Sequence, residues 1–159
     1  MNFSLKKPIT DWLDEYSYYH KNNKNKIIHW FCIPLIMFSL FGLLSLIKFD
    51  LTILGISLDL SHISILAASY FYLRLSIKIS IGLIVFISPL IFIINIMNNL
   101  NSTKTLFCTY LSIFIISWVF QFIGHKIEGK KPAFAKDMKF LLIGPAWMIA
   151  FLYKKLKIR

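Results

Sequence analysis

The chain has 159 residues, 57% of them hydrophobic, and its mean hydropathy is +0.67. A water-soluble fold of this size cannot bury so much apolar surface, so the composition predicts one integral membrane domain, residues 1–159. The formal net charge is +11. The basic residues lie beside the ends of apolar runs rather than on a soluble basic face, which argues against nucleic-acid binding.

The N-terminal segment, before the first apolar run, predicts a short helix at the membrane interface. Trp12, Tyr16 and Tyr19 give it an aromatic face of the kind found where a bilayer meets water. We expect Thr10 or Asp11 to cap its first turn.

A polar stretch with three asparagines, residues 21–26, separates this helix from the first apolar run. Asparagine is a good turn and N-cap former, so the stretch is expected to break the helix and turn the chain. A turn here would fold His20 back towards His29. Tyr16 and His20 are four residues apart, as are Asn25 and His29, so each pair can share a helix face.

Four apolar runs approach the roughly 20 residues that a membrane-spanning helix needs. A fifth run is shorter and is interrupted by Gly144 and Pro145, so we expect it to lie in the interface or to re-enter the same side. The predicted fold is all-α: a polytopic bundle of four transmembrane helices, the N-terminal interfacial helix and a short C-terminal helix. The runs are 29–47, 60–77, 79–97, 105–124 and, for the short one, 140–153.

The basic residues predict the orientation, because cytoplasmic loops are enriched in lysine and arginine. The loop between runs one and two and the loop between runs three and four contain one lysine each, Lys48 and Lys104. We therefore expect the N-terminus, the 125–139 loop and the C-terminus in the cytoplasm, at a bacterial inner membrane or, in a eukaryote, the endoplasmic reticulum. The basic residues expected on that side are Lys6, Lys7, Lys21, Lys24, Lys26, Arg74, Lys78, Lys126, Lys130, Lys131, Lys136, Lys139, Lys154, Lys155, Lys157 and Arg159.

This topology places His20, His29 and His125 at one membrane face and His62 at the other, about 30 Å away. Imidazole is the commonest side-chain metal ligand, and ionisable residues at membrane depth are functional candidates. Glu128 shares a helix face with His125 if the fourth helix continues past Gly124. The pattern predicts a metal site formed by the three histidines, with Glu128 as a ligand or a partner beside it. The alternative is an interfacial belt of aromatic and histidine side chains.

Two blocks of the sequence carry a family resemblance. YSYYHKNNKNKIIHWFCIP and WVFQFIGHKIEGKKPAF resemble the signature blocks of a small membrane family of fungi and bacteria. This family includes the iron(II)-dependent 2-hydroxy fatty acid dioxygenase of fungal phytosphingosine breakdown. The matching positions are Tyr16, His20, Asn25, His29, Pro34, Gly124, His125, Glu128, Gly129, Pro132 and Ala133.

The resemblance implies an iron(II) enzyme that shortens long-chain 2-hydroxy fatty acids by one carbon with O2. His20, His29 and His125 would be the catalytic metal ligands. Asn25 would hydrogen-bond a ligand imidazole, and Tyr16 would do the same or stack in the interface. Lys126, Lys130 and Lys131 would hold the substrate carboxylate, unless they serve only topology and contact with anionic lipid.

Two other functions fit the sequence. A non-enzymatic membrane protein, such as a small transporter or a scaffold, would explain the apolar runs and the charges without requiring the histidines to converge. A haem-binding bundle with two histidine ligands is the third possibility. In each case membrane lipid surrounds the chain, and the oligomeric state is left open.

Overall fold

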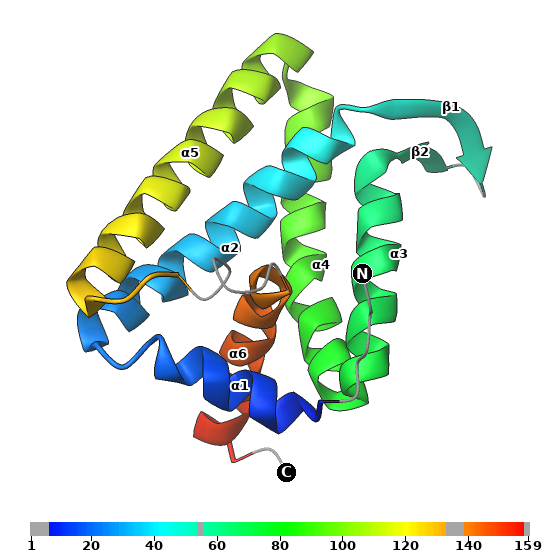
Figure 1. Ribbon diagram of the computed structural model, residues 1–159. Helices are drawn as coiled ribbons and strands as arrows, with labels where there is room; N and C mark the ends of the chain where they lie inside the picture. The colour runs from blue at the N-terminus through cyan, green and yellow to red at the C-terminus, as the bar shows by residue number, and fades with distance from the viewer. Residues whose placement is uncertain (1–6, 54–55, 133–138, 158–159) are drawn as a thin grey trace.

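The computed structural model describes residues 7–53, 56–132 and 139–157, which form a helical bundle with one small β-hairpin (Figure 1). The predicted all-α class is therefore confirmed, and the hairpin is an addition that the sequence did not predict. Lys6, Ala133, Lys136 and Arg159 lie outside the described residues. The elements are α1 (Ile9–Tyr18), α2 (Asn23–Ser45), β1 (Lys48–Ile53), β2 (Ile56–Asp59), α3 (Leu60–Leu75), α4 (Ile77–Leu100), α5 (Thr103–Glu128) and α6 (Phe140–Lys155).

The break between α1 and α2 falls at the polar stretch that was predicted to turn. Asn22 precedes α2, and its side-chain oxygen accepts a hydrogen bond from the Lys24 backbone N–H at 2.9 Å. The predicted cap of α1 is wrong, because that helix already begins after Pro8 and no side chain caps it. Proline has no N–H and a fixed φ suited to a helix start, so Thr10 and Asp11 lie inside the first turn instead.

Three helices, α2, α4 and α5, are long and apolar enough to cross a membrane. The fourth predicted span, 60–77, corresponds to α3, whose 16 residues reach about 24 Å at 1.5 Å per residue. That length is short of the roughly 30 Å of a bilayer's hydrocarbon core. Membrane association thus rests on three helices, and a fourth span stays a prediction.

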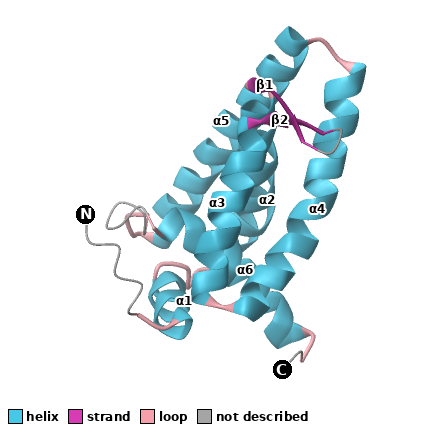
Figure 2. Ribbon diagram, turned by 90° about the vertical axis from the view of Figure 1, so that its right-hand side faces the viewer, coloured by secondary structure: helices cyan, strands magenta, loops and turns pink. Residues whose placement is uncertain are grey.

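Helix α5 packs along α2 at very short range because two glycines lie in their interface. A Cβ atom on Gly42 would lie 2.5 Å from the Tyr110 ring, and one on Gly124 would lie 2.5 Å from Asn25 Oδ1. Helices α3 and α4 form a pair beside α2, and α6 packs against α1, α4 and α2 (Figure 2). The segment 143–149 of α6 is buried at the centre of this arrangement.

The connections separate into two ends of the bundle (Figure 1). The α1–α2 corner, the α3–α4 turn, the end of α5 and the end of α6 lie towards the lower end of the picture. The β1–β2 hairpin and the α4–α5 turn lie towards the upper end. The described parts of the segments predicted to be cytoplasmic therefore lie towards one end of the molecule.

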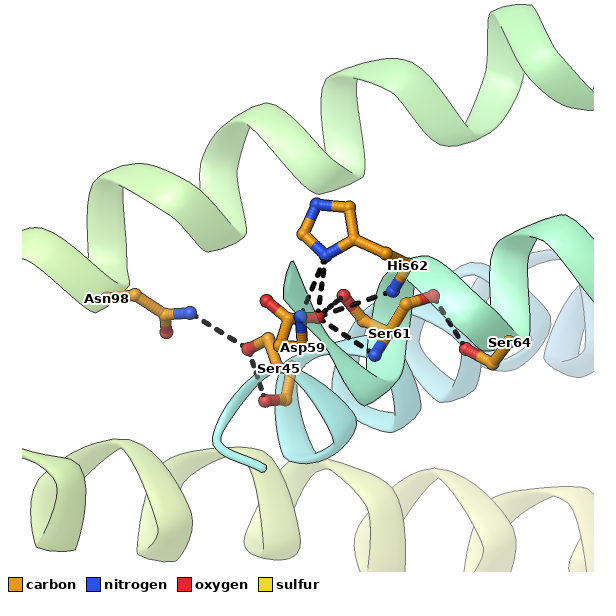
Figure 3. A network of polar contacts seen from close by, with 7 residues as sticks. Ser45, Asp59, Ser61, His62, Ser64 and Asn98 are labelled. Carbon is orange, nitrogen blue, oxygen red and sulfur yellow. Dashed lines mark hydrogen bonds and ion pairs between the residues drawn. The ribbon is translucent and has the colours of Figure 1, made fainter. Parts of the chain in front are cut away.

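His62 lies at the upper end, in a local network at the start of α3 (Figure 3). Its Nδ1 is 2.9 Å from Asp59 Oδ1, which also accepts the backbone N–H of Ser61 at 2.9 Å and so caps α3. Nearby, Asn98 donates to Ser45 Oγ at 2.8 Å. His62 is a helix-capping residue, separated from the other three histidines as expected.

Candidate metal centre

Three separate elements bring His20, His29 and His125 together. His20 lies in the turn after α1, His29 is in the second turn of α2, and His125 is in the last turn of α5. The ring centroids of His20 and His29 are 4.4 Å apart, and the two distances to His125 are 5.1 and 4.8 Å. Each side chain is at most 5% exposed. The fold thus gathers into one buried cluster residues up to 105 positions apart.

Backbone carbonyls set the orientation of two of these rings. His20 Nδ1 lies 2.7 Å from the carbonyl oxygen of Tyr16, and His29 Nδ1 lies 3.0 Å from that of Asn25. A carbonyl oxygen only accepts hydrogen bonds, so Nδ1 carries the hydrogen in both rings. The Nε2 atoms of both neutral imidazoles therefore keep their lone pairs available for another partner.

The cluster contains buried nitrogen atoms that no protein group satisfies. Among the described residues, His20 Nε2 and His125 Nδ1 are buried and have no hydrogen-bond partner. Buried polar atoms without a partner are rare in folded proteins. One nitrogen from each of the three histidines lies within 4.8 Å of the others, a spacing that one ion with bonds of about 2.1 Å can nearly bridge. The donor set fits a metal ion that prefers nitrogen ligands.

Burial favours the neutral form of the imidazole at the α1–α2 corner. It lowers the pKa of His20 below its ordinary value, and the positive charge of Lys26 lowers it further. The hydrogen bond to the Tyr16 carbonyl and the negative charge of Glu128 oppose this shift without reversing it. Because a metal binds the neutral ring, His20 is held in its ligating form at neutral pH.

Tyr16 forms one wall of the cluster. Its ring stacks on that of His20, with centroids 4.1 Å apart and planes 12° from parallel, and it also packs against Trp147. Burial raises the pKa of the Tyr16 phenol above its ordinary value, so the hydroxyl stays protonated. The Tyr16 side chain stacks on the His20 ring inside the fold rather than at the membrane interface, and it is the backbone carbonyl that bonds to the imidazole.

Glu128 lies beside the cluster and ties the end of α5 to the α1–α2 turn. Its carboxylate accepts hydrogen bonds from the backbone N–H groups of Lys21 and Asn22, both at 2.9 Å, and from Asn25 Nδ2 at 3.1 Å. α5 does continue past Gly124, so Glu128 shares a face with His125 as predicted. Sequence reasoning missed this clamp, because the residues it joins are more than 100 positions apart.

An apolar cavity of about 340 Å³ opens beside the three histidines. Along α2 its lining runs from His29 to Leu44, a distance of about 22 Å at 1.5 Å per residue. Ser64, Ala68 and Tyr72 of α3 form part of another wall, and α4, α5, α6 and the end of α1 with His20 contribute the remainder. The cluster is therefore at one end of a long, mostly hydrophobic space.

Comparison with known proteins places this chain in a family. Residues 6–156 match the family described as 2-hydroxy-palmitic acid dioxygenase Mpo1-like. The chain belongs to the Mpo1-like family. It is 30% identical over 142 residues to the 2-hydroxy-palmitic acid dioxygenase MPO1 of Saccharomyces cerevisiae, a match that covers 87% of this chain and 76% of the relative. No solved structure matches the chain.

The lysines that line a cavity next to His20 in this Mpo1-like chain differ from those named in the sequence analysis. Lys126 and Lys131 are exposed, and the cavity beside the histidines does not include them. A second cavity of about 350 Å³ contacts His20 and is lined by Lys21 and Lys26, with Ser17, Trp147 and Phe151. Lys26 is three residues before His29 on α2, a spacing that places both on one face and was visible in the sequence.

Proposed function

We propose that this Mpo1-like chain is an iron(II)-dependent dioxygenase that converts long-chain 2-hydroxy fatty acids into the acid one carbon shorter. His20, His29 and His125 hold the metal in this proposal. One observation carries it: three buried histidines, two with unsatisfied ring nitrogens, meet at the end of a long apolar cavity. The dioxygenase activity named for the yeast relative fits the histidine cluster, and the fatty-acid substrate in that name fits the apolar cavity.

The donor set suits the chemistry that iron(II) supplies when bound. His20, His29 and His125 would hold the iron with three nitrogen donors, and the metal would supply the activation of O2 and a Lewis-acid site that a 2-hydroxy carboxylate can chelate. Cleavage of the C1–C2 bond with one O2 balances as the shortened acid, CO2 and water, so no external reductant is required.

The chain's own residues prepare the site before substrate arrives. The carbonyls of Tyr16 and Asn25 hold the His20 and His29 rings in the ligating tautomer, so little reorganisation is needed on metal binding. The apolar cavity excludes water around the acyl chain, and each methylene transferred there contributes about 0.8 kcal/mol. A long-chain acid is thus preferred strongly over a short one.

Location follows from the same residues. We infer a single multi-pass membrane domain with both termini in the cytoplasm, which places the metal centre near the cytoplasmic face. The substrate head group would meet the metal there, while the acyl chain lies among the helices. Lys21 and Lys26, rather than Lys126 and Lys131, are positioned to attract the carboxylate.

The haem alternative is disfavoured by the contact between the rings. All three imidazole pairs have centroids within 5.1 Å, which leaves no room for a porphyrin plane between two ligands. A transporter or scaffold would not need buried nitrogen atoms without partners, since such atoms cost stability.

The reaction is tested with iron-loaded protein in air. We expect 2-hydroxypalmitate to yield the C15 acid, detected by mass spectrometry, and palmitate to yield none because it lacks the chelating hydroxyl. The apoprotein is the matched control. Iron-replete, folded protein that forms no shortened acid from any 2-hydroxy fatty acid would overturn the proposed function.

A further inference from the structure

The depth of the apolar cavity can be related to the length of a substrate chain. The two helices that form much of its wall, α2 and α3, run in opposite directions and are joined by the β1–β2 hairpin. At the hairpin end they meet, because the Leu60 N–H donates to the Ile47 carbonyl at 2.9 Å. The order of residues along α3 therefore gives the order of positions in this wall, from the hairpin end towards the end of α3.

Ala68 lines the cavity partway along its length. Within α3 it lies between Tyr72, towards the histidine end, and Ser64, towards the hairpin, and all three line the cavity. Ala68 is therefore one helical turn, about 6 Å, beyond Tyr72 on the way to the hairpin end.

We propose that Ala68 determines chain length: its small side chain leaves open the part of the cavity that receives the distal end of a long acyl chain. This inference rests on the proposed function and adds the residue that selects among its substrates. An acyl chain held by its head group at the histidines would reach Ala68 only if it were long. A short chain would end before this level and would not contact it.

The chain offers a matched pair of variants in neighbouring alanines. Ala68 lines the cavity and is half-buried, whereas Ala67 is exposed and faces away from it. Ala68→Phe fills the cavity at this depth, and Ala67→Phe adds the same bulk to the outer surface. Ala68→Val is an intermediate step in size.

The experiment is a competition in one vessel. Full-length, iron-loaded protein is given equal concentrations of 2-hydroxydecanoate and 2-hydroxypalmitate, and the C9 and C15 acids are quantified by mass spectrometry. The product ratio reports relative kcat/KM and does not depend on how much of a variant is folded. This keeps the test decisive even if a variant is less stable.

We expect Ala68→Phe to lower the C15-to-C9 ratio at least about tenfold, because excluding two methylenes from an apolar site already has that effect. Ala68→Val should lower it less, and Ala67→Phe should leave it within about twofold of wild type. An unchanged ratio in Ala68→Phe, or an equal fall in Ala67→Phe, would overturn the inference alone. Absence of both products from the wild-type protein would overturn the proposed function, and the inference with it.

Discussion

At the scale of single residues, the function of a histidine in this chain is set by what surrounds it. His62 bonds to Asp59 and caps a helix, so its ring already has a partner within its own turn. His20 and His125 each keep a buried nitrogen without one. Histidine thus caps a helix at one end of the bundle, and at the other end it contributes unpaired ring nitrogens to the buried cluster.

Metal content should distinguish these histidines. We expect alanine at His20, His29 or His125 to remove most of the bound metal, since each substitution deletes one of three nitrogen donors. His62→Ala should retain it. Metal analysis of anaerobically purified proteins measures this directly. Equal metal content in His62→Ala and His125→Ala would show that the metal does not bind at the proposed three-histidine site.

Glu128 should behave as a clamp rather than as a ligand. Glu128→Ala removes the acceptor for Lys21, Asn22 and Asn25, which loosens the turn carrying His20, and we expect metal affinity to fall by about 10–100-fold. Glu128→Gln keeps part of the hydrogen bonding, so its metal affinity should fall less. Glu15→Ala, which breaks a surface ion pair with Lys7, is the control. A Glu128→Ala protein as metal-free as His125→Ala, in titrations with iron(II), would instead make Glu128 a ligand.

At the scale of elements, the contact between α2 and α5 fixes the position of His125 relative to His29. Gly124 precedes His125 directly, and the helices approach each other there so closely that Asn25 Oδ1 occupies the space of a side chain. Close packing of this kind makes the cluster sensitive to changes that do not touch an imidazole.

Gly124→Ala should therefore destabilise the protein and disturb the cluster. Overpacking of a tight interface costs about 1–3 kcal/mol, which we expect as a lower thermal unfolding midpoint together with weaker metal binding. Ser112→Ala, on an exposed position of the same helix, is the control. Thermal unfolding followed by circular dichroism in detergent measures the first effect. A Gly124→Ala protein as stable as Ser112→Ala would contradict the close approach.

At the scale of the whole molecule, the bundle has a basic end and a less charged end. The α1–α2 corner, the end of α5, the α3–α4 turn and the end of α6 lie towards the same end, and most of the described lysines belong to these segments. An uneven distribution of this kind orients a membrane protein with its basic end in the cytoplasm.

Cysteine labelling tests this orientation. Single cysteines at Lys131 and Lys157 should be protected from a membrane-impermeant reagent in intact cells and react after permeabilisation. Cysteine at Asn101, in the α4–α5 turn, should react in intact cells. The two native cysteines, Cys32 and Cys108, are first replaced by alanine so that they give no signal. Labelling of position 131 or 157 from outside would reverse the proposed topology.

Part of this result follows from the sequence alone. Hydrophobic runs of nearly bilayer length dictate helices, because backbone groups in lipid must be satisfied within their own segment. The three asparagines between residues 21 and 26 predicted the turn before α2, since their side chains favour caps over helix interiors. The i,i+4 spacing in the same region placed Tyr16 beside His20 and Asn25 beside His29, although it is their backbone carbonyls that bond to the two rings. These are local properties of the chain, so they can be read without knowing what it packs against.

Only the tertiary structure decided the rest. The clamp at Glu128 joins residues more than 100 positions apart. Two of its partners are backbone N–H groups, which every residue but proline has, so residue types do not reveal them. Lys21 and Lys26 line a cavity that His20 also lines, whereas neither cavity beside the cluster is lined by Lys126 or Lys131. The cavity beside Ala68 depends on how six helices meet. Empty space is defined by packing between distant segments, and a sequence pattern records only which faces are apolar.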